Sequence, residues 1–314
     1  MIPITNKISL MIYGASDSGK STQARYIAEY VYKTTGKKTR LIALDRGSLW
    51  SPCQDLVDAG IVQALEFPTG FEFNPMAIMR KLRRGEFPEG GVIKAPTAIQ
   101  SKKPNGEMET KYTTNTKWLP WTDQTTEEVG AIVIDSLTTY ATAYMSDTKQ
   151  KNIRFGSDAS SAPRSEEGET MGTNTMSHYG DAHTEILDAL QAFQSLPVHI
   201  TMFTALEGIG ADDDTGVKRP ALGPETVGKA INGKLPSRVN HCFHLQAEGV
   251  GPKKIVKAWY AKHPSDLPKL EWPAKISVPP TRLKEFWAKY PNGYVQLSLE
   301  KGIGEFLEFI EGGK

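Results

Sequence analysis

Residues 14–21 read GASDSGKS, which fits the pattern G-x-x-x-x-G-K-[ST] of a phosphate-binding loop. An apolar run at residues 8–13 leads into this loop, and residues 22–32 behind it carry apolar side chains at helical spacing. This order matters because backbone N–H groups of the loop and of the helix start then point at a polyphosphate. The stretch therefore predicts a strand, a phosphate-binding loop and a helix that together bind a nucleotide.

Two side chains at the end of the loop have an expected partner in a bound magnesium nucleotide. Lys20 can reach the β- and γ-phosphates, and the Ser21 hydroxyl can ligate Mg²⁺. We therefore expect ATP and Mg²⁺ as cofactors. The residues expected to contact the nucleotide are Gly14, Ala15, Ser16, Asp17, Ser18, Gly19, Lys20, Ser21 and Thr22.

The composition limits the class of protein. A chain of 314 residues suits one large α/β domain or two smaller ones, and its net charge of +1 leaves nucleic-acid binding to local basic patches. The presence of only two cysteines favours a reducing compartment. The first residues do not fit a signal peptide, and no apolar run approaches the roughly 18 residues of a membrane span. We expect a cytoplasmic protein without membrane contact.

Strand-like and helix-like segments alternate along most of the chain, which is typical of a parallel sheet with helices on both faces. The expected strands are residues 39–44, 61–67, 131–134, 198–204, 241–245 and 255–260, and the expected helices are 54–59, 74–84 and 181–195. We predict an α/β fold with a core over residues 1–275 and a small separate element over 276–314.

Three segments interrupt the alternation. Residues 85–128 lack strong periodicity and predict an insertion with a hairpin around Asn105-Gly106. Its tryptophans either stack on nucleic-acid bases or pack the hairpin on the core, and we favour packing. Residues 149–178 and 207–234 are polar and predict two mobile loops.

A second nucleotide motif lies at the end of the strand over 131–134. Asp135 follows this strand directly, and its carboxylate would hold Mg²⁺. The next residue is Ser136, a position at which many ATPases with a phosphate-binding loop have a catalytic glutamate. Asp45, at the end of the strand after the first helix, is the candidate base, because ligands bind at the carboxyl ends of parallel strands. Asp45 as a simple turn cap, with Glu66 as the base, is the alternative.

The order of these segments resembles the RecA-like ATPase family. The likeness rests on KTRLIALD at residues 38–45, DSL at 135–137, the helix from Asp181 and VHITMFT at 198–204. It implies a RecA-like core over roughly residues 7–265. It also implies that Thr204 contacts the γ-phosphate or its attacking water, although a hydroxyl that only satisfies a strand edge explains Thr204 equally well.

Three shorter signals resemble phage-encoded RecA-core ATPases of the single-strand-annealing recombinase type. These are Tyr179-Gly180, Arg219-Pro220 and WYAK at residues 259–262. The resemblance implies a homo-oligomer, a ring or a filament, in which Lys262 of one subunit acts on the nucleotide of the next. A solvated lysine at a strand end explains Lys262 equally well. It also implies the host bacterial cytoplasm as location, and an annealing or single-strand-binding protein as partner.

The resemblance further assigns the second polar loop to single-stranded DNA, which cationic loops bind through phosphate contacts. The candidate DNA-binding residues are Lys218, Arg219, Lys229 and Lys234. Three neighbouring aspartates, Asp212, Asp213 and Asp214, oppose this role.

The sequence departs from the recombinase pattern in three ways, the first being that residues 85–128 form a longer segment than expected, with no assigned role. The candidate base Asp45 stands where recombinases have glutamate, and the sequence starts close to the first strand, so we expect no amino-terminal polymerisation element. The predicted function is an ATPase that acts on single-stranded DNA in phage recombination or annealing. A nucleotide-driven DNA motor, of helicase or packaging type, and a non-hydrolysing ATP-dependent scaffold are the alternatives.

Overall fold

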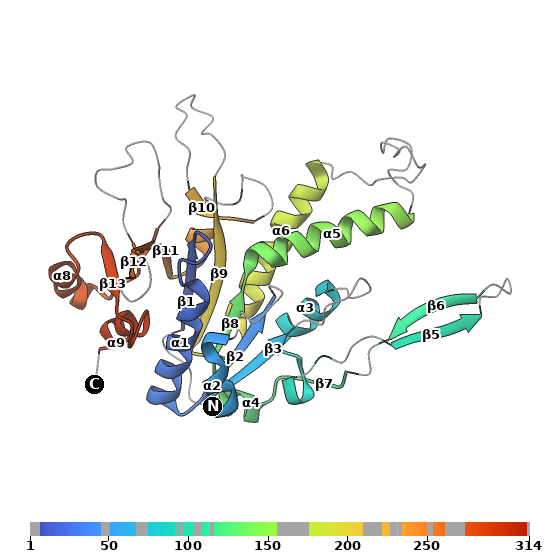
Figure 1. The fold of residues 1–314 in the computed structure, drawn as a ribbon, viewed down its shortest axis with the longest axis horizontal. Helices are drawn as coiled ribbons and strands as arrows, with labels where there is room; N and C mark the ends of the chain where they lie inside the picture. Colours follow the sequence, from blue (N-terminus) through green and yellow to red (C-terminus); the bar gives the residue numbers. More distant parts are fainter. Residues whose placement is uncertain are drawn as a thin grey trace.

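The central sheet contains nine strands within the part of the chain that the computed structural model describes, which is residues 7–44, 51–66, 75–91, 93, 97–102, 108–113, 116–155, 176–209, 222–226, 231, 234–249, 254–260 and 274–312. Its order is β13-β12-β11-β1-β9-β8-β2-β3, with β10 beside β9 (Figure 1). The strands are β1 (Ile8–Gly14), β2 (Lys38–Ala43), β3 (Val62–Glu66), β8 (Val129–Asp135), β9 (Ile200–Ile209), β10 (Leu222–Pro224), β11 (His241–Glu248), β12 (Ile255–Trp259) and β13 (Tyr294–Leu297).

The predicted parallel α/β sheet is confirmed. Strand β1 pairs in parallel with β9 and β11, and β2 pairs in parallel with β3 and β8. Strands β10, β12 and β13 run antiparallel to their neighbours. Every residue of β1 is buried, because the strand lies mid-sheet with helices over both faces, and this explains its uninterrupted apolar sequence.

Helices cover both faces of the sheet, as predicted. Alternate side chains of β1 separate into two cores: Met11 and Tyr13 face the helices α3, α5 and α6, whereas Leu10 and Ile12 face α1, α8 and α9. The helices are α1 (Lys20–Thr35), α2 (Gln54–Asp58), α3 (Pro75–Arg83), α4 (Asp123–Glu128), α5 (Leu137–Phe155), α6 (Met176–Ser195), α8 (Pro280–Lys289) and α9 (Gly304–Glu311).

The insertion contains the predicted hairpin. Strands β5 (Thr97–Lys102) and β6 (Met108–Thr113) pair antiparallel, and Figure 1 shows them extending away from the main sheet. A second pair, β4 (Phe87–Pro88) with β7 (Trp118–Leu119), ties the base of the insertion together. Trp118 and Trp121 pack against the core, and the Arg40 guanidinium lies 5.1 Å from the Trp121 ring. These two tryptophans therefore pack the base of the insertion onto the body of the protein.

Helix and strand residues extend into both segments that the sequence predicts to be mobile loops. Helix α5 continues to Phe155 and α6 begins at Met176, and the two helices contact each other. Strand β9 continues to Ile209, because β10 pairs with its extension. Residues 156–175 and 210–221 lie outside the described part of the chain.

The carboxyl-terminal segment joins the main sheet, which differs from the separate element expected for residues 276–314. Strand β13 pairs with β12, and Phe306 and Leu307 of α9 are fully buried in the core that α1 also faces. The reason is that a segment of this size buries too little apolar surface to fold alone.

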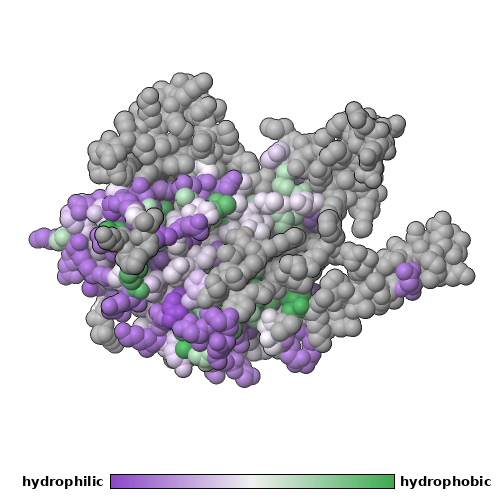
Figure 2. All heavy atoms as spheres, in the orientation of Figure 1, coloured by the Kyte–Doolittle hydropathy of each residue, from purple (hydrophilic) through white to green (hydrophobic). Residues whose placement is uncertain are grey.

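The surface of the described residues is mostly hydrophilic in the orientation of Figure 1. Hydrophobic residues are scattered singly over this face instead of forming one large patch (Figure 2). Among the described residues, no helix is long and apolar enough to cross a membrane.

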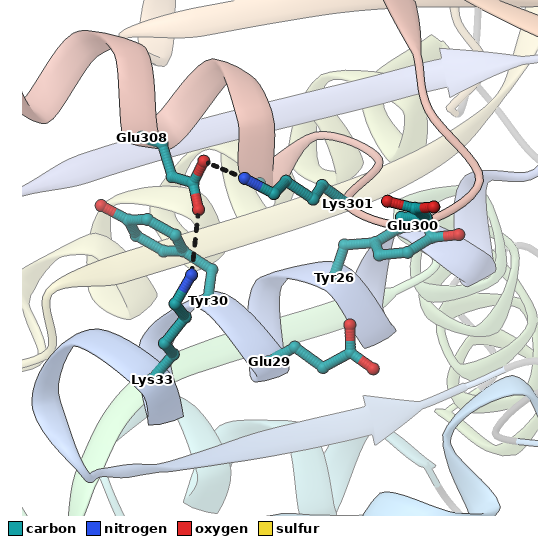
Figure 3. Close-up of a pocket in the computed structure, with 8 residues that line it drawn as sticks. Tyr26, Glu29, Tyr30, Lys33, Glu300, Lys301 and Glu308 are labelled. Carbon is teal, nitrogen blue, oxygen red and sulfur yellow. Dashed lines mark hydrogen bonds and ion pairs between the residues drawn. The ribbon is translucent and has the colours of Figure 1, made fainter. Parts of the chain in front are cut away.

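Helix α1 and the carboxyl-terminal segment meet in a polar contact that Figure 3 shows in close-up. Glu308 accepts from Lys301 at 2.8 Å and pairs with Lys33 at 3.5 Å. The Tyr26 hydroxyl donates to the Leu299 carbonyl at 2.6 Å. Gly302 has φ +48°, and a Cβ there would lie 2.0 Å from the Tyr26 ring. The chain can therefore pass this ring only with glycine at position 302.

We predict that Gly302→Ala destabilises the fold by about 2 kcal/mol or more, since left-handed backbone strain and overpacking act together. Gly60→Ala is the matched control, because Gly60 has φ +71° but a Cβ at this position would meet no atom within 4 Å. The control should lose only about 1–2 kcal/mol from strain. Urea unfolding of both variants measures the difference, and equal losses would contradict the close packing at Tyr26.

Candidate nucleotide-binding site

The phosphate-binding loop joins the end of β1 to the start of α1. Gly19 precedes the helix with φ +95°, and no side chain caps the helix start. The first turn of α1 also contains no acidic residue. The N–H groups and the positive end of the helix dipole therefore have the arrangement that favours binding of an anion.

Lys20 folds back over the loop. Its Nζ donates to the Gly14 carbonyl at 3.0 Å and to the Ala15 carbonyl at 2.6 Å, and the residue is only 9% exposed. A Cβ at Gly14 would lie 2.4 Å from the Leu245 carbonyl oxygen of β11. Glycine at position 14 thus lets β11 approach the first residue of the loop. The hydrogen bonds from Lys20 then hold the first two residues of the loop in place.

Asp135 and Thr204 come together from neighbouring strands. Asp135 ends β8 and is 3% exposed, and the Thr204 hydroxyl of β9 donates to its carboxylate. The Leu44 N–H donates to the Asp135 backbone carbonyl at 2.6 Å, which fixes the end of β8 against β2. Thr204 therefore orients the carboxylate that the sequence predicts to hold Mg²⁺.

This donor set fits a magnesium nucleotide. Lys20 and the N–H groups of the loop would hold the phosphates, and the Gly14 position leaves no room for a side chain at the loop entrance. Asp135 and the Ser21 hydroxyl, both oxygen donors, would hold Mg²⁺, which prefers such ligands.

Glu207 is a site residue that the sequence analysis missed. Its predecessor Leu206 pairs with Gly14, so Glu207 lies beside the first residues of the loop. His244 Nε2 lies 2.7 Å from the Glu207 carboxylate. The hydrogen bond from His244 is the main cause that lowers the pKa of Glu207 below its ordinary 4.5, and the charge of Lys20 and the Ala15 N–H lower it further. The sequence pattern missed Glu207 because it predicts a strand that ends at Thr204 and a polar loop that begins at residue 207.

Two further contacts hold the loop from outside. Lys254, at the start of β12, donates from Nζ to the Asp17 carbonyl at 2.5 Å. Gln23 donates to the Gly19 carbonyl at 3.2 Å and accepts from the Ile303 N–H at 2.9 Å. These contacts therefore hold the loop against the residue before β12 and against the carboxyl-terminal segment.

Most of the remaining predicted site residues lie outside the described part of the chain: Asp45, Lys218, Arg219, Lys229 and Lys262. Lys234 is described and exposed. It precedes η3 (Leu235–Arg238), which packs against α6 and leads into the amino end of β11. The β9–β10 hairpin lies at the carboxyl ends of the parallel strands, near the loop. Lys234 is thus at the end of the sheet opposite the nucleotide site.

A parallel sheet with this loop at its carboxyl edge and an aspartate on the second strand away defines a P-loop ATPase. Comparison with known families agrees: residues 6–249 match the AAA domain family, and the chain belongs to it. A crystal structure of a KaiC-like protein from the hyperthermophilic archaeon Pyrococcus horikoshii OT3 is similar over 93% of this chain and 89% of that chain, with 11% sequence identity and a TM-score of 0.38. No curated protein matches the chain.

Lys20→Ala should weaken ATP binding by about 10-fold or more, which is the range for loss of a hydrogen bond to a charged group. Isothermal titration with Mg-ATP measures the affinity, and circular dichroism checks the fold. Lys33→Ala, in the last turn of the same helix, is the control and should bind normally. An unchanged affinity of Lys20→Ala would contradict the assignment of the loop.

Thr204→Val should weaken ATP binding in the presence of Mg²⁺ by about 5-fold, corresponding to one lost hydrogen bond of about 1 kcal/mol. Binding without Mg²⁺ should change little, because Thr204 acts on the Asp135 carboxylate. Thr201→Val, at a buried position on the same strand, is the matched control. If both variants lose affinity equally with and without Mg²⁺, Thr204 does not act through Asp135.

Proposed function

We propose that this protein is a Mg²⁺-dependent ATPase that acts on single-stranded DNA in a recombination or annealing role of the kind that phages encode. The observation that carries the ATPase part is the convergence of Lys20, Asp135 and Thr204 at one edge of the sheet. Lys20 lies on the loop, and Thr204 bonds the Asp135 carboxylate from the next strand. A phosphate-binding lysine and a magnesium-binding aspartate are the two groups that phosphoryl transfer to water requires first.

Hydrolysis also requires a base or a group that positions water. Asp135 is buried and accepts from Thr204, so it suits the metal better than the water. The chain offers Asp45 after β2 and Glu207 on β9 as carboxylates for this second role.

The DNA part of the proposal rests on the path of β9. This strand carries Thr204 and Glu207 and then pairs with β10 at the same end of the sheet as the loop. The chain between these strands contains Lys218 and Arg219. A contact of that segment with DNA would therefore be connected to the nucleotide through one continuous strand, which favours an ATPase whose activity depends on DNA.

Assembly into a homo-oligomer, a ring or a filament, completes the proposal. Lys262 of one subunit would act at the nucleotide of the next, as a cation that stabilises the charge of the transition state. An annealing or single-strand-binding protein is the partner that this role requires.

The test is ATP turnover with and without single-stranded DNA, together with DNA affinity at several salt concentrations. Each lost phosphate contact should lower the log–log salt slope by about 0.7 for a single strand. Lys218→Ala combined with Arg219→Ala should therefore flatten the slope by about 1.4. The comparison variant combines Lys234→Ala with Arg238→Ala. Lys234 was also predicted to bind DNA, but it lies before η3 at the opposite end of the sheet, so we expect this variant to keep the parent slope.

The outcomes separate the proposed roles. If both double variants show the same salt slope of DNA affinity, the segment between β9 and β10 is not the DNA contact. ATP binding without turnover, with or without DNA, would indicate a non-hydrolysing scaffold. Directional movement along DNA would indicate a motor.

A further inference from the structure

Glu207 contacts the phosphate-binding loop directly, from outside the residues that the motifs identify. The Ala15 N–H donates to its carboxylate, and the charge of Lys20 acts on it. The carboxylate lies at the same edge of the sheet as Asp135, one strand away in the order β1-β9-β8. It is therefore beside the loop that would hold the terminal phosphates.

Exposure distinguishes Glu207 from the carboxylate assigned to the metal. The Glu207 side chain is 30% exposed, whereas Asp135 is 3% exposed. A group that takes a proton from water must reach both the water and, afterwards, the solvent. Its exposure gives Glu207 the access to solvent that the buried Asp135 lacks.

His244 fixes the direction of the Glu207 carboxylate. Its side chain is 5% exposed, its Nε2 bonds the carboxylate at 2.7 Å, and its ring lies 5.0 Å from the Tyr13 ring. Among the described residues, the titratable groups that act on Glu207 are His244 on β11, Lys20 on α1 and Tyr13 on β1. The two basic groups favour the ionised carboxylate, which is the form that accepts a proton.

We propose that Glu207 is the general base for ATP hydrolysis and that His244 is the residue that positions it. The inference rests on the proposed ATPase function. The water oxygen bonds to the γ-phosphorus while the bond from that phosphorus to the bridging oxygen of ADP breaks, and ADP keeps the electron pair. The proton of the water moves to a Glu207 carboxylate oxygen and then to solvent.

A purely structural role would give Glu207 a different signature. As a brace, it would only accept the Ala15 N–H and keep the loop in shape. Glu207→Gln separates the two roles, because glutamine keeps an oxygen acceptor of the same reach but does not take up a proton at neutral pH. Glu248→Gln is the matched control: Glu248 ends β11 and pairs with Lys257 at 2.7 Å.

The experiment measures ATP affinity by calorimetry and hydrolysis in a single turnover. Glu207→Gln should bind ATP within about 3-fold of the parent and hydrolyse it about 10²-fold more slowly, within the range for loss of a general base. Glu248→Gln should match the parent in both. Asp45→Asn is measured in parallel.

Normal turnover of Glu207→Gln in a parent that hydrolyses ATP would overturn this inference alone, and a loss confined to Asp45→Asn would assign the base to Asp45. A loss of affinity equal to the loss of turnover would show a brace and also overturn it. A parent that binds ATP without hydrolysing it would overturn the proposed ATPase and this inference together.

His244 has its own readout in the pH profile. His244→Leu should lower kcat with little change in KM and move the acid limb of kcat upward, because the carboxylate loses the hydrogen bond that lowers its pKa. His244→Gln keeps an N–H donor and should restore part of both. An unmoved limb in His244→Leu would overturn the positioning role of His244.

Discussion

The close approach of β1 and β11 at Gly14 is the constraint on which the nucleotide edge depends. A Cβ at Gly14 would collide with the Leu245 carbonyl oxygen. Strands β1 and β11 can therefore pair up to the first residue of the loop only because position 14 is glycine. This contact brings His244 beside Tyr13 and sets the direction in which the loop leaves the sheet. Strand β11 also pairs with β12, and β12 pairs with β13 of the carboxyl-terminal segment.

Strand β9 supplies both faces of the site because its side chains alternate. Thr204 lies on the side of α1 and bonds Asp135, whereas Glu207, three residues further on, lies on the other side and bonds His244. One strand therefore reaches the metal-binding carboxylate and the entrance of the loop together. A shift of β9 along its axis would move both contacts at once.

The sequence predicted the parts of this site that depend on local pattern. The loop and Asp135 follow from a motif and from a strand ending in a carboxylate, and the sheet follows from short apolar runs between helices. Glu207 was missed because a polar residue after an apolar run resembles the start of a loop, and because its partner His244 is 37 residues away in the chain. The ends of α5 and α6 were missed because residues 149–178 are polar, and a polar composition alone does not show where a helix ends.

Gln23 connects two segments that are distant in the sequence, the phosphate-binding loop and the start of α9. Its amide group bonds the Gly19 carbonyl in the loop and the Ile303 N–H at the start of the last helix, 280 residues away. Thermodynamic reciprocity then applies: a nucleotide that orders the loop also protects the end of the chain against local opening, and docking of that end favours the loop geometry that binds nucleotide. The last helix is in this sense part of the nucleotide site, although it contributes no atom that would touch the phosphates.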